Sequence, residues 1–340
     1  MFTNQNNYIK HSYFMNLALE QAKINLGNTK ENPSVGCVIV KNNSLVSAGS
    51  TGVNGRPHAE YNAIKWSKNR LKNTEIYITL EPCSHYGQTP PCTKLIIKNN
   101  IKRVFFSILD PDINTHNKSS SILKKKNIIV KSGINSKILN DFYSSYKKSR
   151  KNTLPFLTSK IAISKDFFTV DKKNKFITNK YSRARVHLIR SNHDCIMTSS
   201  QTILKDNSRL TCRIDGLHKT SPVRIILDKK LKVSLKSNVV SDINRKKTII
   251  FYNNKNIKRI KKLKKMGVKL IKIDLDNENN LDIFKILIKV KKLGFYRVLL
   301  ESGIKLTSKF LEKNLVDEFL LFISDKNLKN RGMNNAKKAL

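Results

Sequence analysis

The stretch EIYITLEPCSHYGQTPPC, residues 75–92, joins an apolar run to two cysteines that each follow a proline. Residues 75–80 predict a buried strand, because short runs rich in β-branched and aromatic residues favour strands. Cys83 and Cys92 enclose the eight residues SHYGQTPP. A disulfide, a metal site and a chance pairing are the three explanations for this spacing.

Cysteine usage narrows these explanations. The chain holds five cysteines in 340 residues, an odd number that argues against the disulfide framework of a small secreted domain. The sequence opens without a secretory signal pattern and has no apolar run long enough for a membrane span, so we expect a soluble, cytoplasmic protein that does not bind membranes. In a reducing compartment, a close cysteine pair more often binds a metal or performs chemistry.

A third candidate ligand lies upstream, in PHAE at residues 57–60. His58, Cys83 and Cys92 offer one imidazole and two thiolates, a set that suits tetrahedral Zn²⁺ and leaves the fourth position to water, as in catalytic sites. Zinc lowers the pKa of such a water towards ~7. Glu60 is predicted to take a proton from that water and to pass it to a leaving amine.

Each predicted ligand follows a proline, at positions 57, 82 and 91. Proline is favoured in the first turn of a helix, so we expect all three ligands at helix N-termini, where the helix dipole favours thiolate. A His/Cys/Cys zinc set with a non-ligand Glu is the signature of nucleobase deaminases, although their cysteines usually enclose two residues. His85 is predicted to be an exposed loop residue, and the remaining cysteines are predicted to be small apolar core residues: Cys37, Cys195 and Cys212.

The formal net charge of +42 is the most prominent feature of the composition. A nucleic-acid-binding protein concentrates basic residues on one face or tail, whereas here they recur from KKSRKN at 147–152 to KRIKKLKKMG at 258–267. Lys, Asn and Ile share A/T-rich codons, so mutational bias explains their joint abundance. We therefore expect at most non-specific contact with nucleic acid, weakened by salt.

Two α/β domains are predicted from the order of the apolar segments. Strand-like and helix-like runs alternate over the first 145 residues, which indicates a mostly parallel sheet covered by helices. The charged run ending at Pro155 marks a boundary, and the alternation then restarts. We assign a deaminase domain to residues 1–148 and a second domain to 149–340.

The chain resembles the family of bifunctional riboflavin-biosynthesis deaminase/reductases. The resemblance rests on NPSVGCVIV at 32–40, on PHAE and EPCSHYGQTPPC, and, in the second half, on KIAISKDFF at 160–168, residues 190–213, PVRIILD at 222–228 and VLLESG at 298–303. It implies a cytidine-deaminase-like three-layer domain followed by a dihydrofolate-reductase-like α/β domain. It also implies hydrolytic deamination of 2,5-diamino-6-ribosylamino-4(3H)-pyrimidinone 5′-phosphate, then reduction of its ribosyl group to ribityl with NADPH.

The resemblance also implies roles for individual residues. The zinc ligands fall on His58, Cys83 and Cys92, and the proton shuttle falls on Glu60. Positions for the NADPH cofactor fall on Ala162, Phe176, Thr202, Asp206 and the loop beginning at Gly303. Positions for the substrate fall on Asn32, Asn174, Arg190, Leu210, Arg213 and Glu301. We further expect a homo-oligomer.

Three departures from the family pattern concern this sequence. Phe167 stands where the family has Gly, Phe176 replaces a frequent Trp, and Gln88 stands where the deaminase loop often carries a basic residue. The chain also ends early for the family, so we expect an unpaired sheet edge and a reductase weaker than the deaminase. Two alternatives stay open, a zinc deaminase that acts on RNA or DNA and a basic nucleic-acid-binding protein.

Overall fold

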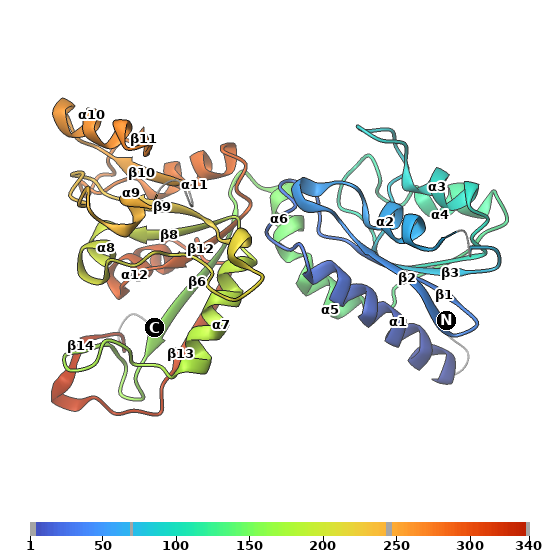
Figure 1. Ribbon diagram of the computed structural model, residues 1–340, viewed down its shortest axis with the longest axis horizontal. Coiled ribbons are helices and arrows are strands. Elements are labelled where there is room, and N and C mark those ends of the chain that lie inside the picture. Colours follow the sequence, from blue (N-terminus) through green and yellow to red (C-terminus); the bar gives the residue numbers. More distant parts are fainter. Residues whose placement is uncertain (1–4, 69–70, 243–246, 338–340) are drawn as a thin grey trace. The chain divides into compact units, whose positions relative to one another are not determined.

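The computed structural model describes residues 5–68, 71–242 and 247–337. The chain forms two compact units, Met1–Asn152 and Thr153–Leu340 (Figure 1). The boundary predicted between residues 148 and 149 falls inside helix α6 (Ser144–Lys151). Among the described helices, none combines the length and the apolar character needed to cross a membrane.

Unit 1 is built on a five-stranded sheet with the order β2-β1-β3-β4-β5. β3 pairs in parallel with β4, and β4 with β5, whereas β1 runs antiparallel to both of its neighbours. The sheet is therefore mixed: β1 runs opposite to the other four strands, which share one direction as a mostly parallel sheet predicts. The strands are β1 (Gly36–Lys41), β2 (Ser44–Ser50), β3 (Glu75–Leu80), β4 (Arg103–Ile108) and β5 (Ile129–Ser132).

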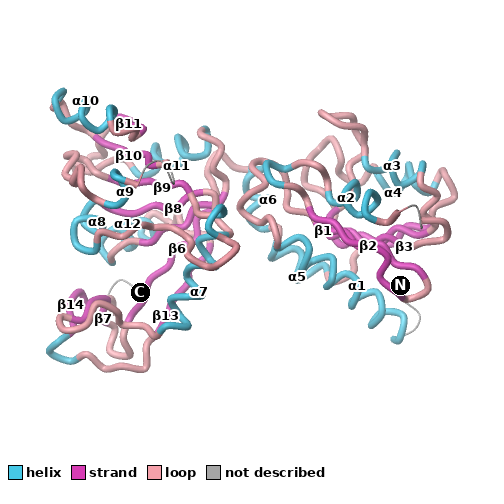
Figure 2. Tube along the Cα trace, viewed as in Figure 1, coloured by secondary structure: helices cyan, strands magenta, loops and turns pink. Residues whose placement is uncertain are grey.

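Helices cover both faces of this sheet, which gives the predicted three layers. α1 and α5 lie on one face, and α2, α3 and α4 lie on the other (Figures 1 and 2). One continuous apolar core holds the layers together, with Ile39, Ile78 and Phe106 fully buried in it. The helices are α1 (Gln5–Lys23), α2 (Ala59–Trp66), α3 (Cys92–Lys98), α4 (Ser119–Lys124), α5 (Ser136–Phe142) and α6.

Gly49 sets how closely α2 lies on the sheet. A Cβ atom at this position would stand 2.4 Å from the carbonyl oxygen of Ala59 and 2.4 Å from the amide nitrogen of Ala63. Only a residue without a side chain allows β2 and α2 to approach so closely. This contact fixes the first turn of α2, which carries Glu60.

Unit 2 is built on a seven-stranded sheet with the order β11-β10-β9-β8-β12-β6-β13. Every pairing in it is parallel. The strands are β6 (Phe156–Ile163), β8 (Cys195–Ser199), β9 (Val223–Leu227), β10 (Thr248–Tyr252), β11 (Lys269–Lys272), β12 (Arg297–Glu301) and β13 (Glu318–Ile323). A two-stranded antiparallel ribbon adds β7 (Phe168–Asp171) and β14 (Gly332–Asn335).

Two apolar cores lie on the opposite faces of this sheet. Along β9, Ile225 and Leu227 belong to one core and Ile226 to the other, since successive side chains of a strand point to opposite faces. Helices α11 and α12 contribute to the first core, and α8, α9 and α10 to the second. The helices are α7 (Lys180–Ser191), α8 (Ser200–Asp206), α9 (Asn238–Ser241), α10 (Ile257–Lys265), α11 (Ile283–Lys292) and α12 (Ile304–Glu312).

Candidate active site

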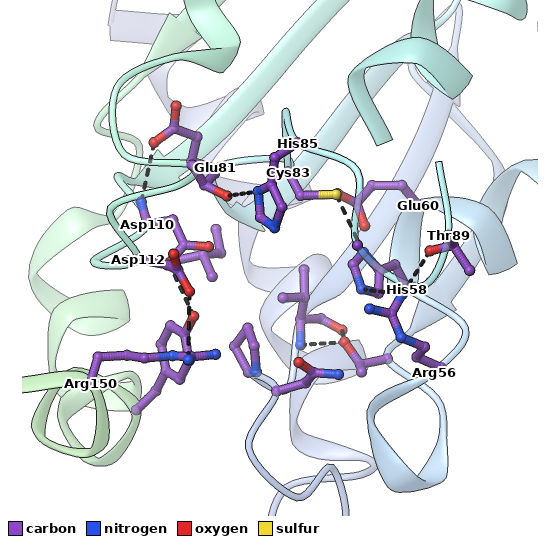
Figure 3. A pocket seen from close by; sticks show the side chains of 18 residues that line it. Arg56, His58, Glu60, Glu81, Cys83, His85, Thr89, Asp110, Asp112 and Arg150 are labelled. Carbon is purple, nitrogen blue, oxygen red and sulfur yellow. Dashed lines mark hydrogen bonds and ion pairs between the residues drawn. The ribbon is translucent and has the colours of Figure 1, made fainter. Parts of the chain in front are cut away.

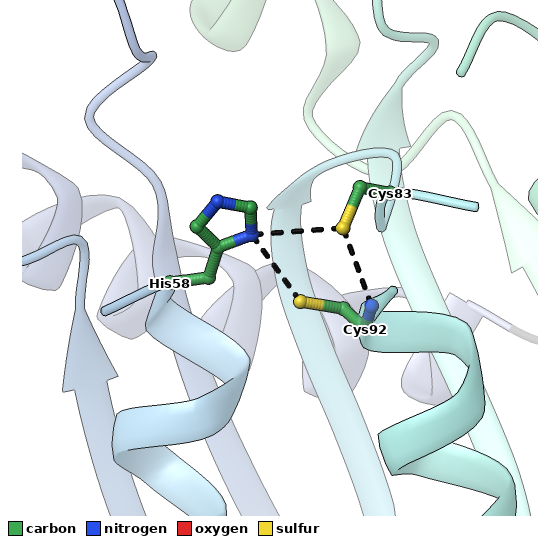
Figure 4. A group of neighbouring side chains, drawn as sticks. All are labelled: His58, Cys83 and Cys92. Carbon is green, nitrogen blue, oxygen red and sulfur yellow. Dashed lines mark hydrogen bonds between the residues drawn. The ribbon is translucent and has the colours of Figure 1, made fainter. Parts of the chain in front are cut away.

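Two segments of unit 1 bring the three predicted metal ligands together. His58 is the N-cap residue of α2, and Cys92 is the first residue of α3. Cys83 lies in the irregular segment after β3, so the prediction that Pro82 opens a helix is wrong. The ligand atoms all lie within 4.8 Å of one another, and Figure 4 shows the imidazole facing both sulfurs.

The spacing of these atoms fits a tetrahedral zinc ion. Nδ1 of His58 lies 3.6 Å from Sγ of Cys83 and 3.4 Å from Sγ of Cys92. Zn–S and Zn–N bonds of usual length separate neighbouring ligand atoms in a regular tetrahedron by about 3.5 Å. One nitrogen and two sulfur donors at this separation therefore fit Zn²⁺ and leave a fourth position.

The thiols of Cys83 and Cys92 have pKa values shifted in opposite directions. Hydrogen bonding from the Cys92 side chain lowers the pKa of the Cys83 thiol to about 4, although burial opposes this change. The backbone N–H of Cys92 also donates to Sγ of Cys83 at 3.2 Å. The hydrogen bond to Cys83 and burial raise the pKa of Cys92 above its usual value. A zinc ion bound here would be held by both sulfurs as thiolates, since the thiolate is the metal-ligating form of cysteine.

Glu60 lies in the first turn of α2, two residues after His58, and its side chain is buried. Burial raises the pKa of Glu60 to about 7. A carboxyl group with a pKa near neutrality can both accept and return a proton at physiological pH. The Glu60 carboxylate and the Cys92 side chain lie close enough to shift each other's pKa, so the carboxylate lies near the ligand set.

His58, Glu60 and Cys83 line one end of a pocket (Figure 3). The residues at the other end were not predicted from the sequence. There, Oδ1 of Asp110 accepts a hydrogen bond from the Tyr146 hydroxyl at 3.1 Å, and burial raises the pKa of Asp110 to about 6. Asp112 lies 3.5 Å from the guanidinium of Arg150, which stacks over Tyr146. Asp110 follows the carboxyl end of β4, and ligands bind at the carboxyl ends of strands in open α/β sheets. This position in the sequence could have identified Asp110 as a candidate site residue.

Glu81, the first residue of EPCSHYGQTPPC, holds the Asp110 loop. Its carboxylate accepts hydrogen bonds from the backbone N–H groups of Asp110 at 3.2 Å, Asn117 at 2.9 Å and Ser119 at 3.0 Å. The same residue thus anchors the segment that carries Cys83 to the segment that carries Asp110. Of the other predicted pocket residues, Asn32 lines the pocket and donates through Nδ2 to the carbonyl oxygen of Gly55 at 3.0 Å.

In unit 2, Arg190 and Glu301 form a two-bonded ion pair. Nε and Nη2 of Arg190 each donate to a Glu301 oxygen at 2.8 Å. Burial opposes ionisation, but Arg190 holds the pKa of Glu301 at about 2. Lys160 of β6, which was not predicted, adds a cation nearby, and burial lowers its pKa.

Three of the remaining predicted residues of unit 2 lie at or just after the carboxyl ends of three adjacent strands. β8, β12 and β6 are neighbours in the sheet, and their carboxyl ends lead to Thr202 in the first turn of α8, to Gly303 as N-cap of α12, and to Ala162. Carboxyl ends of parallel strands are the usual ligand-binding edge. The others are Asp206 at the end of α8, Asn174 bonded to Asp171, exposed Phe176 and Arg213, and buried Leu210.

Two family models match the two units separately. Residues 9–108 match the cytidine and deoxycytidylate deaminase zinc-binding region. Residues 155–328 match the RibD C-terminal domain. The two matches follow one another in the order that the sequence predicts.

Relatives that match over most of both chains are also found. Riboflavin biosynthesis protein RibD from Bacillus amyloliquefaciens is 33% identical over 314 residues, which cover 92% of this chain and 84% of the relative. The protein of the same name from Aquifex aeolicus is 34% identical, covering 92% and 86%. Among solved structures, RibD from Acinetobacter baumannii is 29% identical with a TM-score of 0.80, covering 96% of this chain and 90% of that one.

A Thermotoga maritima structure is described as a diaminohydroxyphosphoribosylaminopyrimidine deaminase/5-amino-6-(5-phosphoribosylamino)uracil reductase. It is 29% identical with a TM-score of 0.83 and covers 98% of this chain and 92% of that one. The similarity therefore includes both units.

Proposed function

This chain belongs to the RibD family of bifunctional deaminase/reductases of riboflavin biosynthesis, and we propose that it performs two consecutive steps on one pyrimidine nucleotide. Unit 1 removes the 2-amino group of 2,5-diamino-6-ribosylamino-4(3H)-pyrimidinone 5′-phosphate by hydrolysis. Unit 2 then reduces the ribosyl group to ribityl with NADPH. The observation that carries this proposal is similarity over 98% of the chain to a protein described by both activities.

Unit 1 supplies the residues for the hydrolytic step. His58, Cys83 and Cys92 hold Zn²⁺, which supplies Lewis-acid activation at neutral pH. Glu60 accepts a proton from the attacking water and delivers it to the departing amine. The water oxygen bonds to the ring carbon, the second water proton goes to the adjacent ring nitrogen, the C–N bond breaks, and ammonia leaves. Asn32, in the pocket lining, orients the nucleotide.

Unit 2 supplies the residues for the reduction. NADPH supplies the hydride, and the protein binds and orients both molecules. The cofactor lies against Ala162, Phe176, Thr202, Asp206 and the loop at Gly303. The nucleotide contacts Asn174, Arg190, Leu210, Arg213 and Glu301. The Arg190–Glu301 pair fixes the direction of both side chains, because a bidentate ion pair holds each group in one geometry.

We further propose that the protein is a cytoplasmic homo-oligomer. All five cysteines are free, which is the expected state in a reducing compartment. Size-exclusion chromatography with light scattering tests the assembly, and a single species with a mass near 39.0 kDa contradicts it.

The direct test measures both products in turn. Purified protein is given the diamino pyrimidine nucleotide, and ammonia release is compared with release from tRNA and single-stranded DNA. NADPH is then added, and its absorbance is followed. We expect ammonia from the nucleotide alone and NADPH oxidation only after deamination. Ammonia from a nucleic acid instead would identify a polynucleotide deaminase.

A further inference from the structure

Arg56 is a pocket-lining cation that the mechanism above does not use. The pocket in unit 1 has two arginines in its lining, Arg56 and Arg150. Arg150 faces the carboxylate of Asp112 at 3.5 Å. Arg56 instead donates from Nη1 to Oγ1 of Thr89 at 2.7 Å, and the same Nη1 lies 3.3 Å from Nε2 of His58 (Figure 3). Within the described residues, no carboxylate forms an ion pair with it at 4.0 Å or less.

When Nδ1 of His58 ligates a metal, the contact between Arg56 and His58 contains no hydrogen-bond acceptor. A guanidinium carries donors only. His58 turns Nδ1 to the two sulfurs, so a neutral imidazole that ligates through Nδ1 keeps its proton on Nε2. Two N–H donors then face each other. The outer N–H of a ligating histidine usually donates to an oxygen acceptor, and an oxygen placed here would accept from both groups.

The surroundings of this position suit an anion. Thr89 adds a hydroxyl to the two N–H donors. The adjacent loop is open, since a Cβ atom at Gly87 would meet only Nη2 of Arg56, at 3.5 Å. Nδ1 and Nε2 lie on different sides of the imidazole ring, so an anion at Nε2 leaves the space beside the sulfurs and Glu60 to the reacting ring.

We propose that Arg56, with the Thr89 hydroxyl and Nε2–H of His58, binds the phosphate of the nucleotide in the deaminase pocket and selects the 5′-phosphate over the free nucleoside. A planar guanidinium presents two parallel N–H groups to phosphate oxygens, and such charge-assisted bonds are strong. The proposal rests on the deaminase function proposed above. It adds to that function the residue that selects the phosphate.

Steady-state ammonia release from the nucleotide and from its dephosphorylated form tests the selectivity, because this assay reads unit 1 alone. Arg56→Gln is expected to raise KM for the nucleotide by about 10- to 100-fold, the value of a hydrogen bond to a charged group. It should leave kcat within a few-fold and KM for the nucleoside unchanged. Arg56→Lys, which keeps the charge but loses the fork, should fall between. Lys65→Gln on the exposed face of α2 removes the same charge outside the pocket and should change neither constant.

A binding measurement gives a readout that does not depend on turnover. In the Glu60→Gln background, with zinc content measured first, the nucleotide should slow backbone hydrogen exchange in residues 84–91, and the nucleoside should do so only at higher concentration. Adding Arg56→Gln should abolish this difference while protection of residues 190–213 in unit 2 persists.

Two outcomes distinguish a wrong role for Arg56 from a wrong deaminase function. If the parent releases ammonia but Arg56→Gln keeps the same preference for the nucleotide, the role of Arg56 is wrong and the proposed function stands. If the parent releases no ammonia, the proposed function fails, and the exchange experiment still decides whether Arg56 binds a phosphate.

Discussion

Phe167 occupies a backbone conformation that suits glycine. Its φ angle is +67°, in the left-handed region where a bulky side chain is costly. Its N–H donates to the carbonyl oxygen of Ser164 at 3.0 Å, closing the turn between β6 and β7. Asp166 holds the same turn by accepting from the N–H groups of Leu328 and Lys329. The surrounding bonds thus maintain the turn although the family's glycine is missing.

Replacing Phe167 by Gly is therefore expected to stabilise unit 2. Relief of the left-handed conformation gives about 1–2 kcal/mol, and the greater freedom of Gly in the unfolded chain removes about 0.5–1 kcal/mol. The difference between the two terms is a net gain of roughly 0–1.5 kcal/mol in the free energy of unfolding. Urea titration with pulsed hydrogen exchange measures the unfolding of unit 2 separately, because exchange is followed in peptides that come from unit 2. Phe168→Gly is the matched control and should destabilise, since the Phe168 ring packs on Gly332.

Glu60 supports a second prediction at this scale. Glu60→Gln should retain zinc and lose deamination by about 10²–10⁴-fold, because the amide fills the same space but cannot carry the proton. Metal content and ammonia release are measured on the same sample. A variant within a factor of two of the parent would assign the proton transfer to another group.

Residue types and neighbours made part of the site predictable. His58, Cys83, Cys92 and Glu60 are uncommon in this chain and lie in short distinctive motifs. Arg150 could not be recognised in the same way, because it is one of 66 basic residues and reaches the pocket only through the position of α6. Chain geometry, which sequence spacing does not reveal, decides which of many similar side chains faces a ligand.

At the scale of elements, the junction of α7 and β8 encloses a buried histidine. Nδ1 of His193 lies 2.7 Å from the carbonyl oxygen of Ile189, and its side chain is buried. Burial lowers the pKa of His193 to about 3. The unfolded value is higher, about 6.5, so the native state favours the neutral ring.

Unit 2 should consequently lose stability in mild acid. A folded pKa below the unfolded one gives a contribution that is present above pH 6.5 and is lost as the pH falls towards 3. Between pH 8 and pH 5 the loss from His193 is about 2 kcal/mol. We expect His193→Gln to show a correspondingly smaller loss in urea titrations at the two pH values. Equal losses in parent and variant would mean that His193 does not set this dependence.

Strands were predictable from the sequence where their side chains are buried on both faces of the sheet. The apolar run at 75–80, predicted as a buried strand, is β3, and all six of its residues are buried. β2 was missed because SLVSAGS is rich in Ser and Gly and is half exposed at the sheet edge. The helix predicted to start at Pro82 is absent, because proline is favoured in irregular segments as well as at helix starts.

For the whole molecule, the net charge of +42 does not define the function. The relatives match along both units, including the reductase half that a polynucleotide deaminase or a basic DNA-binding protein would not need. Binding to arbitrary DNA should be weak, and the logarithm of the association constant should fall linearly with the logarithm of salt concentration. Fluorescence anisotropy measures this slope. Nanomolar, sequence-selective binding at about 0.2 M salt would instead indicate specific recognition.

The placement of the three ligands gives zinc a second consequence, for folding. His58 is 25 residues from Cys83 and 34 from Cys92, so one ion cross-links distant parts of unit 1 and closes a long loop. In a chain-entropy model such closure is worth about 3–4 kcal/mol. A chelator should therefore lower the urea midpoint of unit 1 and spare unit 2, and Cys83→Ser should remove this response. Equal chelator effects on both units would contradict the cross-link. Metal supply would then set not only how fast the deaminase works but how much of it stays folded.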